Sequence, residues 1–278
     1  MRLASVSHEG AQWVATIEDG RAYPVGSLRE LGPAASMSEV ASMSVNRDRG
    51  IPTSEVRFRP LVPNPRRIVC VGLNYVAHAA ESDRDVPTYP VLFTKFASTL
   101  TGAFDDIPCP AESNAIDYEG ELVVVIGERT RRISPAAALS AVWGVSVAND
   151  VSMRDFQNKT HQWLQGKAWD GATPVGPELV TLDEIPSLDD LTLRTLVNGE
   201  VVQEASTAAM IFDIPTLVST ISVFTELEPG DLILTGTPSG VGFRREPQIL
   251  LAPGDVSVVE VPGVCRLQNQ FIAENISA

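Results

Sequence analysis

Three acidic side chains, Asp117, Glu119 and Glu121, stand at alternate positions in AIDYEGELVVVIG, which continues into an apolar strand. In an extended strand every second side chain lies on the same face, so the sequence places three carboxylates together. In a cleft, two carboxylates ~4 Å apart would repel each other by ~4 kcal/mol at an effective dielectric of ~20, and a cation would be needed. A solvated strand end and a metal site are both consistent with this pattern.

Asp150 is a further acidic residue at the end of an apolar run, in VSVANDVSMRDFQ. Together with Glu119 and Glu121 it would form an all-oxygen ligand set, which suits Mg²⁺ or Mn²⁺ and disfavours zinc. A structural alternative is an N-cap, because Asn149 or Asp150 could accept the first free amides of a helix that begins here.

Two cationic side chains follow and could contact a substrate. If a helix starts at Asp150, Arg154 and Gln157 follow it at i+4 and i+7 on one face. Arg154 could then pair with a substrate carboxylate, or with its neighbour Asp155. Lys167, in QGKAWDG, could stabilise a developing enolate or oxyanion, or it could lie along the surface.

A histidine and a glutamate lie three residues apart in GLNYVAHAAES. In a helix, His78 and Glu81 would be side by side, and the carboxylate would raise the basicity of the imidazole, as a general base requires. The alternative is an ordinary surface pair. His8 and His161 have no such neighbour, and we interpret them as structural or surface residues.

The run LTGTPSGVG, which includes Thr237, has three glycines after an apolar strand. It matches neither GxxxxGK[ST] nor GxGxxG, so no nucleotide site is predicted. The run indicates either an anion-contacting turn or a plain hairpin loop.

The elements that must position these residues are predicted to be mainly strands with a few helices. Short β-branched runs separated by Pro and Gly recur: RIVCVG, VLFTKF, ELVVVIG, VWGVSVAND, LRTLVNG, DLILTG and VSVVEV. Helical spacing is found in NYVAHAAES, SMRDFQNKT and IFDIPTLVSTISVF. Four prolines between Gly50 and Arg67 indicate a linker. We therefore expect a small β-rich N-terminal domain at 1–60 and a second domain at 61–278.

The composition of the 278-residue chain limits its partners. With 35 acidic and 21 basic residues the formal net charge is −14, which would repel a nucleic acid backbone. No run approaches the ~20 apolar residues of a membrane span, and the start has no signal-peptide core, so we expect a cytoplasmic protein. Cys70, Cys109 and Cys265 lack CxxC spacing and are odd in number, which predicts buried thiols.

Read in order, these motifs resemble the fumarylacetoacetate hydrolase family. The resemblance covers residues 66–272 through VGLNYVAHAAES, PVLFTKFAS, IDYEGELVVVIG, ANDVSMRDFQ, GKAWDGATPVGP, VNGEVVQ, LEPGDLILTGTPSGVG and LAPGDVSVVEVPG. It implies a mixed β-roll catalytic domain, a divalent metal and usually a homodimer. STAAMIF and GVCRLQNQF depart from the more usual NTSDMIF and GLGRLRN forms, and the first 60 residues resemble the family's leader domain only loosely.

The resemblance also implies a role for each candidate side chain. It implies that Glu119, Glu121 and Asp150 bind the metal, with Asp117 in a supporting position next to these ligands. His78 and Glu81 match the His-x-x-Glu pair of the family's lid helix, and Lys167 matches the catalytic lysine of its Gly-Lys motif. Arg154, Gln157 and Thr237 match residues that contact the oxo-acid group of the substrate.

Several reactions are compatible with these motifs. A 2-oxo acid chelated by Mg²⁺ or Mn²⁺ can form a stabilised pyruvate enolate when the neighbouring C–C bond breaks, and these reactions share that intermediate. The first expectation is acylpyruvate hydrolysis, with His78 as base on water and Lys167 beside the oxyanion, or oxaloacetate decarboxylation. The alternative is an isomerase or tautomerase of 2-hydroxyhepta-2,4-diene-1,7-dioate or a related 2-hydroxy-dienoate in aromatic catabolism. A third is a non-catalytic protein that binds a small 2-oxo acid.

Overall fold

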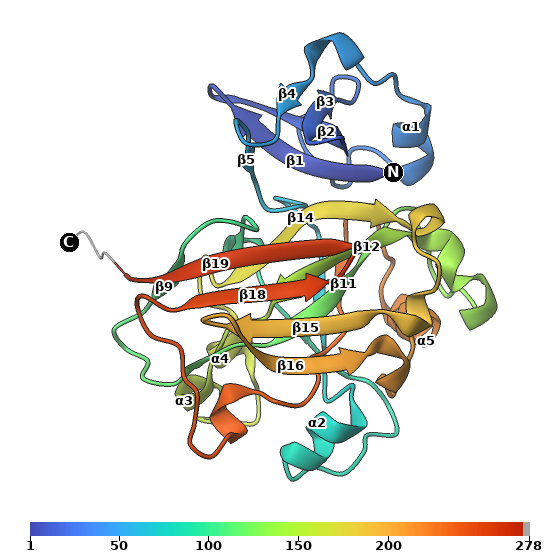
Figure 1. Cartoon of the computed structure of the whole chain (residues 1–278). Coiled ribbons are helices and arrows are strands. Elements are labelled where there is room, and N and C mark those ends of the chain that lie inside the picture. Colours follow the sequence, from blue (N-terminus) through green and yellow to red (C-terminus); the bar gives the residue numbers. More distant parts are fainter. Residues whose placement is uncertain (275–278) are drawn as a thin grey trace.

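Strands dominate the computed structural model, which describes residues 1–274 (Figure 1). Twelve of them form one sheet: β1 (Arg2–His8), β2 (Ala11–Glu18), β3 (Arg21–Pro24), β4 (Ile51–Pro52), β5 (Arg57–Phe58), β6 (Ile68–Gly72), β7 (Val91–Thr94), β8 (Leu100–Thr101), β11 (Gly120–Ile126), β12 (Val142–Asn149), β14 (Thr173–Thr181) and β17 (Leu232–Leu234). Five form a second sheet: β9 (Ile107–Cys109), β15 (Thr192–Val197), β16 (Glu200–Ser206), β18 (Val256–Val261) and β19 (Cys265–Ala273). A separate two-stranded ladder joins β10 (Ile116–Asp117) to β13 (Ser152–Met153). The prediction of a mainly β fold is confirmed.

The helices are short and lie around the sheets. They are α1 (Met37–Ser42), α2 (Val76–Glu81), α3 (Arg154–Gln157), α4 (Leu164–Lys167) and α5 (Ile214–Phe224), with 3-10 turns η1 (Arg47–Arg49), η2 (Ala97–Thr99), η3 (Pro135–Ala141), η4 (Leu182–Glu184), η5 (Leu188–Asp190), η6 (Thr207–Ala209) and η7 (Gly242–Arg244). All three predicted helical stretches contain a helix, α2, α3 and α5, although α3 covers only four residues of its stretch. Asp213 caps α5 by accepting a hydrogen bond from the Thr216 amide at 2.8 Å.

The two sheets pack face to face: β15, β18 and β19 contact β11, β12 and β14, and in Figure 1 the smaller sheet lies in front of β11 and β12. The main path of the large sheet is β4-β3-β2-β1-β14-β12-β11-β17-β6-β7, and that of the smaller sheet is β16-β15-β18-β19-β9. Most pairs are antiparallel, but β6 with β17, β8 with β14 and β9 with β19 are parallel. The sheets are therefore mixed, as the resemblance implies.

Strand β11 is buried on both faces because it lies between two apolar cores. Leu122 and Val124 point into the core between the two sheets, which α5 also covers. Val123 and Val125 point to the opposite face, into a core that the N-terminal segment completes. Burial of each such side chain contributes roughly 1.5–3 kcal/mol. Glu121 belongs to the second of these faces by alternation, so its carboxylate lies away from the smaller sheet.

The N-terminal strands extend the large sheet, and Figure 1 shows them at the end of the molecule opposite α2. β1 meets β14 through the pairs Arg2↔Val180 and Leu3↔Leu179. The division between 1–60 and 61–278 stays a prediction, and residues 275–278 of the second predicted domain lie outside the described residues.

The three cysteines are buried free thiols, as predicted. In residues 1–274, we find no helix with the length and apolar character to span a membrane.

Gly120 provides a test of how closely the sheets must approach. A Cβ atom at this position would lie 2.0 Å from Thr195 Oγ1 on β15 and 3.2 Å from Val259 Cγ1 on β18. We expect Gly120→Ala to lower the free energy of unfolding by about 1–3 kcal/mol, the usual cost of overpacking a core. Chemical denaturation measures this loss, and an unchanged unfolding midpoint would contradict the tight contact.

Candidate metal and active site

The three carboxylates predicted as metal ligands come together in the structure. Glu119, Glu121 and Asp150 are buried, and one oxygen from each lies within 4.8 Å of the others. Glu119 immediately precedes β11, and Asp150 immediately follows β12. The antiparallel pairing Gly120↔Asn149 brings these two strand ends side by side.

Two buried lysines bind the carboxylate cluster. Lys167 Nζ donates to Glu119 Oε2 at 2.5 Å and to Asp150 Oδ2 at 2.8 Å. Lys95 Nζ donates to Asp150 Oδ1. Sequence reasoning missed Lys95, although a lysine directly after the apolar run VLFT is a signal, because a buried lysine requires a partner.

Lys167 reaches the cluster because α4 packs very closely on α3. A Cβ atom on Gly166 would lie 2.5 Å from the backbone nitrogen of Gln157. Glycine at this position therefore allows the two short helices to approach, and Lys167 follows it directly in the sequence.

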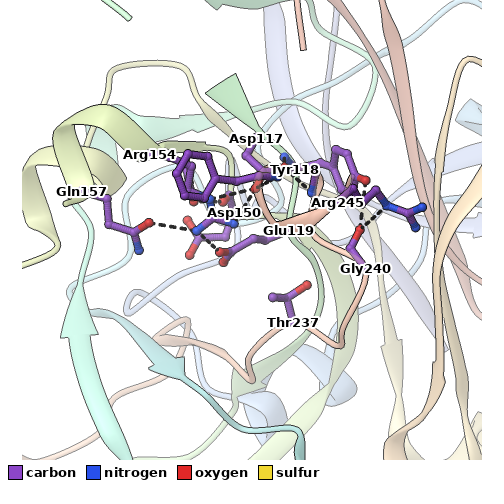
Figure 2. A network of polar contacts seen from close by, with 12 residues as sticks. Asp117, Tyr118, Glu119, Asp150, Arg154, Gln157, Thr237, Gly240 and Arg245 are labelled. Carbon is purple, nitrogen blue, oxygen red and sulfur yellow. Dashed lines mark hydrogen bonds and ion pairs between the residues drawn. The ribbon is translucent and has the colours of Figure 1, made fainter. Parts of the chain in front are cut away.

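Arg154 connects the cluster to a fourth buried carboxylate, Asp117 (Figure 2). Its Nε donates to Asp117 Oδ2 at 2.8 Å, and its Nη1 lies 2.7 Å from Glu119 Oε1. Nη1 also donates to Gln157 Oε1 at 2.9 Å. Asp117 Oδ1 accepts the Gly242 amide at 2.8 Å, so the guanidinium is oriented by partners on several elements.

The structure corrects one local expectation and excludes two alternatives that the sequence left open. Asp117 does not share a strand with Glu121, because β10 pairs with β13 and β11 begins only at Gly120. Asp150 caps no helix: β13 intervenes, and α3 begins at Arg154 without a side-chain cap. Asp155 does not pair with Arg154 but accepts a hydrogen bond from the Ser113 hydroxyl.

Opposite charges fix the protonation of two members of the cluster. Burial alone would raise the pKa of Glu119, but Lys167 and Arg154 outweigh it and lower that pKa to about 2. Burial would likewise lower the pKa of Lys167, yet Asp150 and Glu119 raise it well above its usual value. Glu119 is therefore a carboxylate and Lys167 an ammonium group at neutral pH.

Glu121 is the member of the cluster that is left without a cationic partner. It accepts the Gly236 amide at 2.8 Å, while burial and the negative charges of Asp150 and Glu119 raise its pKa. Four buried carboxylates thus face three cations. Oxygen ligands with a surplus of negative charge fit a divalent ion such as Mg²⁺ or Mn²⁺, so Glu119, Glu121 and Asp150 are the residues that would hold it.

His78 and Glu81 lie on α2, at the edge of the same site. His78 Nδ1 is 3.2 Å from Glu81 Oε2, as the spacing predicted. Glu81 Oε1 accepts the Gly240 amide at 2.9 Å, which ties α2 to the turn after β17. With Nδ1 engaged by the carboxylate, Nε2 is the nitrogen of His78 that remains for proton transfer.

Thr237 is positioned by a second residue that the sequence did not reveal, Gln203 on β16. Gln203 Nε2 donates to Thr237 Oγ1 at 2.8 Å, and its Oε1 accepts the Gly120 amide at 3.0 Å. Because the Thr237 oxygen already accepts a hydrogen bond, its proton is free to be donated to a ligand.

One cavity unites most of these side chains. Its volume is about 100 Å³, which leaves room for a small molecule and not for a polymer. The predicted site residues that line it are His78, Glu119, Arg154, Gln157, Lys167 and Thr237. Glu81, Glu121 and Asp150 are not among its lining residues.

Comparisons with known proteins agree with the motifs. Residues 67–272 match the protein-family profile "Fumarylacetoacetate (FAA) hydrolase C-terminal". The chain is 44% identical over 224 residues to "Oxaloacetate tautomerase FAHD2A, mitochondrial" of Homo sapiens, covering 80% of this chain and 71% of that protein. It also resembles two solved structures over 99% of its length. One is 2-hydroxyhepta-2,4-diene-1,7-dioate isomerase from Mycobacterium marinum (TM-score 0.84, 33% identity, 99% of that chain). The other is fumarylacetoacetate hydrolase from psychrophilic Exiguobacterium antarcticum (TM-score 0.86, 37% identity, 100% of that chain).

Glu121→Gln tests the metal site without an activity assay. We expect this change to weaken Mg²⁺ and Mn²⁺ binding at least about tenfold in calorimetric titrations. Mutation of residues that only hydrogen-bond to a metal ligand already costs about this much, and Glu121 is proposed as a ligand itself. The metal-free protein should be no less stable to heat, because burial and the charges of Asp150 and Glu119 already raise the pKa of Glu121 and so favour its neutral form, which glutamine mimics. Glu112→Gln, at an exposed position, is the control. Equal metal affinity in both variants would contradict the assignment of Glu121.

Proposed function

The chain belongs to the fumarylacetoacetate hydrolase family, and from this premise we propose that it catalyses metal-assisted keto–enol tautomerisation of a short 2-oxo acid such as oxaloacetate. The observation that carries the proposal is the position of His78. Among the described residues that line the cavity it is the single histidine, and it lies beside the carboxylate cluster with Glu81 behind it. The tautomerase and isomerase names of the relatives favour the same class.

The chain's own residues can bind and orient such a substrate. A bound divalent ion would supply electron withdrawal from the 2-oxo group. Arg154 and Gln157 face the cavity as donors for the adjacent carboxylate, and Thr237 can add a hydroxyl donor. Lys167, held as an ammonium group, stabilises negative charge that develops on the C2 oxygen.

Proton transfer is the part assigned to His78. In the enol-to-keto direction the C2 hydroxyl releases its proton to solvent, and C3 gains one from the protonated His78 imidazole, which then takes up a proton from solvent. Lys167 cannot act as the base, because its carboxylate partners keep it protonated. His78, oriented through Nδ1 by Glu81, can exchange a proton with C3 through Nε2.

Acylpyruvate hydrolysis is the second candidate. The same dyad could deprotonate a water molecule for attack on the distal carbonyl, and one solved relative carries the name of a hydrolase. Oxaloacetate decarboxylation and dienoate isomerisation pass through a related enolate, so the reactions must be separated by experiment.

His78→Ala and Glu81→Gln test the proton-transfer role. We expect His78→Ala to lower the enzymatic rate of oxaloacetate tautomerisation by roughly 10²–10⁴-fold, the usual contribution of general acid–base catalysis. Glu81→Gln should have a smaller effect, because it can still accept the Gly240 amide. The loss of enol absorbance in weak buffer measures the rate, with and without EDTA. Release of carbon dioxide and cleavage of acetylpyruvate or fumarylpyruvate are measured in parallel.

The pattern across these assays distinguishes the candidates. Tautomerisation that exceeds hydrolysis and depends on His78 supports the first proposal, while efficient acylpyruvate cleavage that depends on His78 supports the second. A tautomerisation rate that is unchanged in His78→Ala would remove His78 from the mechanism, and full turnover in excess EDTA would contradict the metal requirement.

Oxalate tests the assignment of Arg154 and Gln157, because it mimics the planar 2-oxo acid end. We expect competitive inhibition that Arg154→Ala weakens by ~1.5–3 kcal/mol, as for a charge-assisted hydrogen bond. Gln157→Ala should weaken it by about 0.5–1.5 kcal/mol and is the safer variant for folding, because Arg154 also neutralises Asp117 and Glu119. Arg266→Ala, on β19 of the smaller sheet, serves as the control. Unchanged inhibition constants in both variants would place the oxo-acid group elsewhere.

A further inference from the structure

The mouth of the cavity is lined by cations that the proposed chemistry does not use. Arg84, in the segment after α2, and Arg244, in η7, line the same cavity as His78 and Arg154. Both are exposed at this rim. They come from segments far apart in the sequence, so the fold, and not local sequence, brings them to one opening.

Neither guanidinium is neutralised within the protein as Arg154 is. Arg244 Nη2 donates to the Ser82 carbonyl at 3.1 Å, and its Nη1 is 3.6 Å from Asp83 Oδ2. That carboxylate is 90% exposed, so water screens the pair and it contributes little. Within residues 1–274, Arg84 has no carboxylate partner at ion-pair distance. Both side chains therefore retain donors for a ligand.

The positive rim is unusual for a chain with a net charge of −14. A neighbouring hollow shares Arg84, Asn158 and Trp163 with the cavity and adds Lys159 and His161. The overall field of the protein opposes the approach of a dianion, and a local group of cations at the entrance offsets that repulsion. The inner end already has cations for one carboxylate, so the outer cations fit a second anionic group.

We propose that Arg84 and Arg244 bind a second carboxylate at the distal end of the substrate, and that the enzyme therefore prefers 2-oxo dicarboxylates to 2-oxo monocarboxylates. The inference rests on the proposed function, because the 2-oxo acid end must lie against Arg154 and Gln157. Guanidinium groups match the planar, two-oxygen geometry of a carboxylate. The apolar lining from Val241 and Phe243 would instead favour an uncharged acyl end, and the experiment separates the two.

Binding of matched ligand pairs tests the proposal without turnover. The pairs are 2-oxoglutarate with 2-oxopentanoate and 2-oxoadipate with 2-oxohexanoate, which differ within each pair only in the distal carboxylate. Calorimetry in the presence of Mg²⁺ should show that the protein binds at least one dicarboxylate more tightly than its partner. Arg84→Gln and Arg244→Gln should each lower the affinity for that dicarboxylate about tenfold, which is the effect expected for the loss of one charge-assisted hydrogen bond. Affinity for the monocarboxylates and for oxalate should stay unchanged.

Arg49→Gln is the matched control, because it removes the same charge from an exposed site on η1, in the N-terminal region at the end opposite α2 (Figure 1). Equal weakening of mono- and dicarboxylates in the rim variants, or no weakening of either, would overturn the distal subsite. If the wild-type protein bound the monocarboxylates more tightly, the outer wall would bind an uncharged acyl end and the proposal would be wrong. If oxalate fails to bind the wild-type protein with Mg²⁺, the proposed function itself fails, and the distal subsite falls with it.

Discussion

Four carboxylates buried in one small volume are the constraint on which the structure of this site depends. Ionised groups are costly to remove from water unless each has a partner, and like charges at this distance repel. Lys95, Lys167 and Arg154 supply that partnership from three different segments of the chain. Glu121 is left without a cationic partner and has a raised pKa, and a divalent ion would stabilise its ionised form, which gives the cluster a physical reason to hold one.

The two-sheet core makes this arrangement rigid. Apolar side chains of β11 alternate between two cores, so the face that carries Glu121 is fixed by packing on both sides. Gly120 lets the smaller sheet approach, and Gln203 reaches from that sheet to hold both the Gly120 amide and Thr237. A change in the contact between the sheets would therefore be felt in the geometry of the site, although no residue of the smaller sheet belongs to the carboxylate cluster.

We place the proposed chemistry and the proposed selectivity at opposite ends of the cavity. At the inner end, charges are mutually compensated and strongly oriented, which suits stabilisation of an enolate common to several reactions. At the outer end, α2 and the turn after β17 meet through Glu81 and Gly240, and the cations there are open to solvent. Selection among 2-oxo acids is therefore expected to depend on the outer wall, where Arg84 and Arg244 lie just outside the family motifs.

The sequence by itself determined the β-rich fold, the positions of α2 and α5, the family, and the choice of Glu119, Glu121 and Asp150 as candidate ligands. These depend on periodicity and on motif order, which are local properties. Only the tertiary structure decided which cations reach the carboxylates, as with Lys95, because a lysine after an apolar run does not specify its partner. It also decided that Asp150 faces this cluster instead of capping a helix. Pairing of β10 with β13 occupies the backbone there, and strand pairing between distant segments is not encoded in a local pattern.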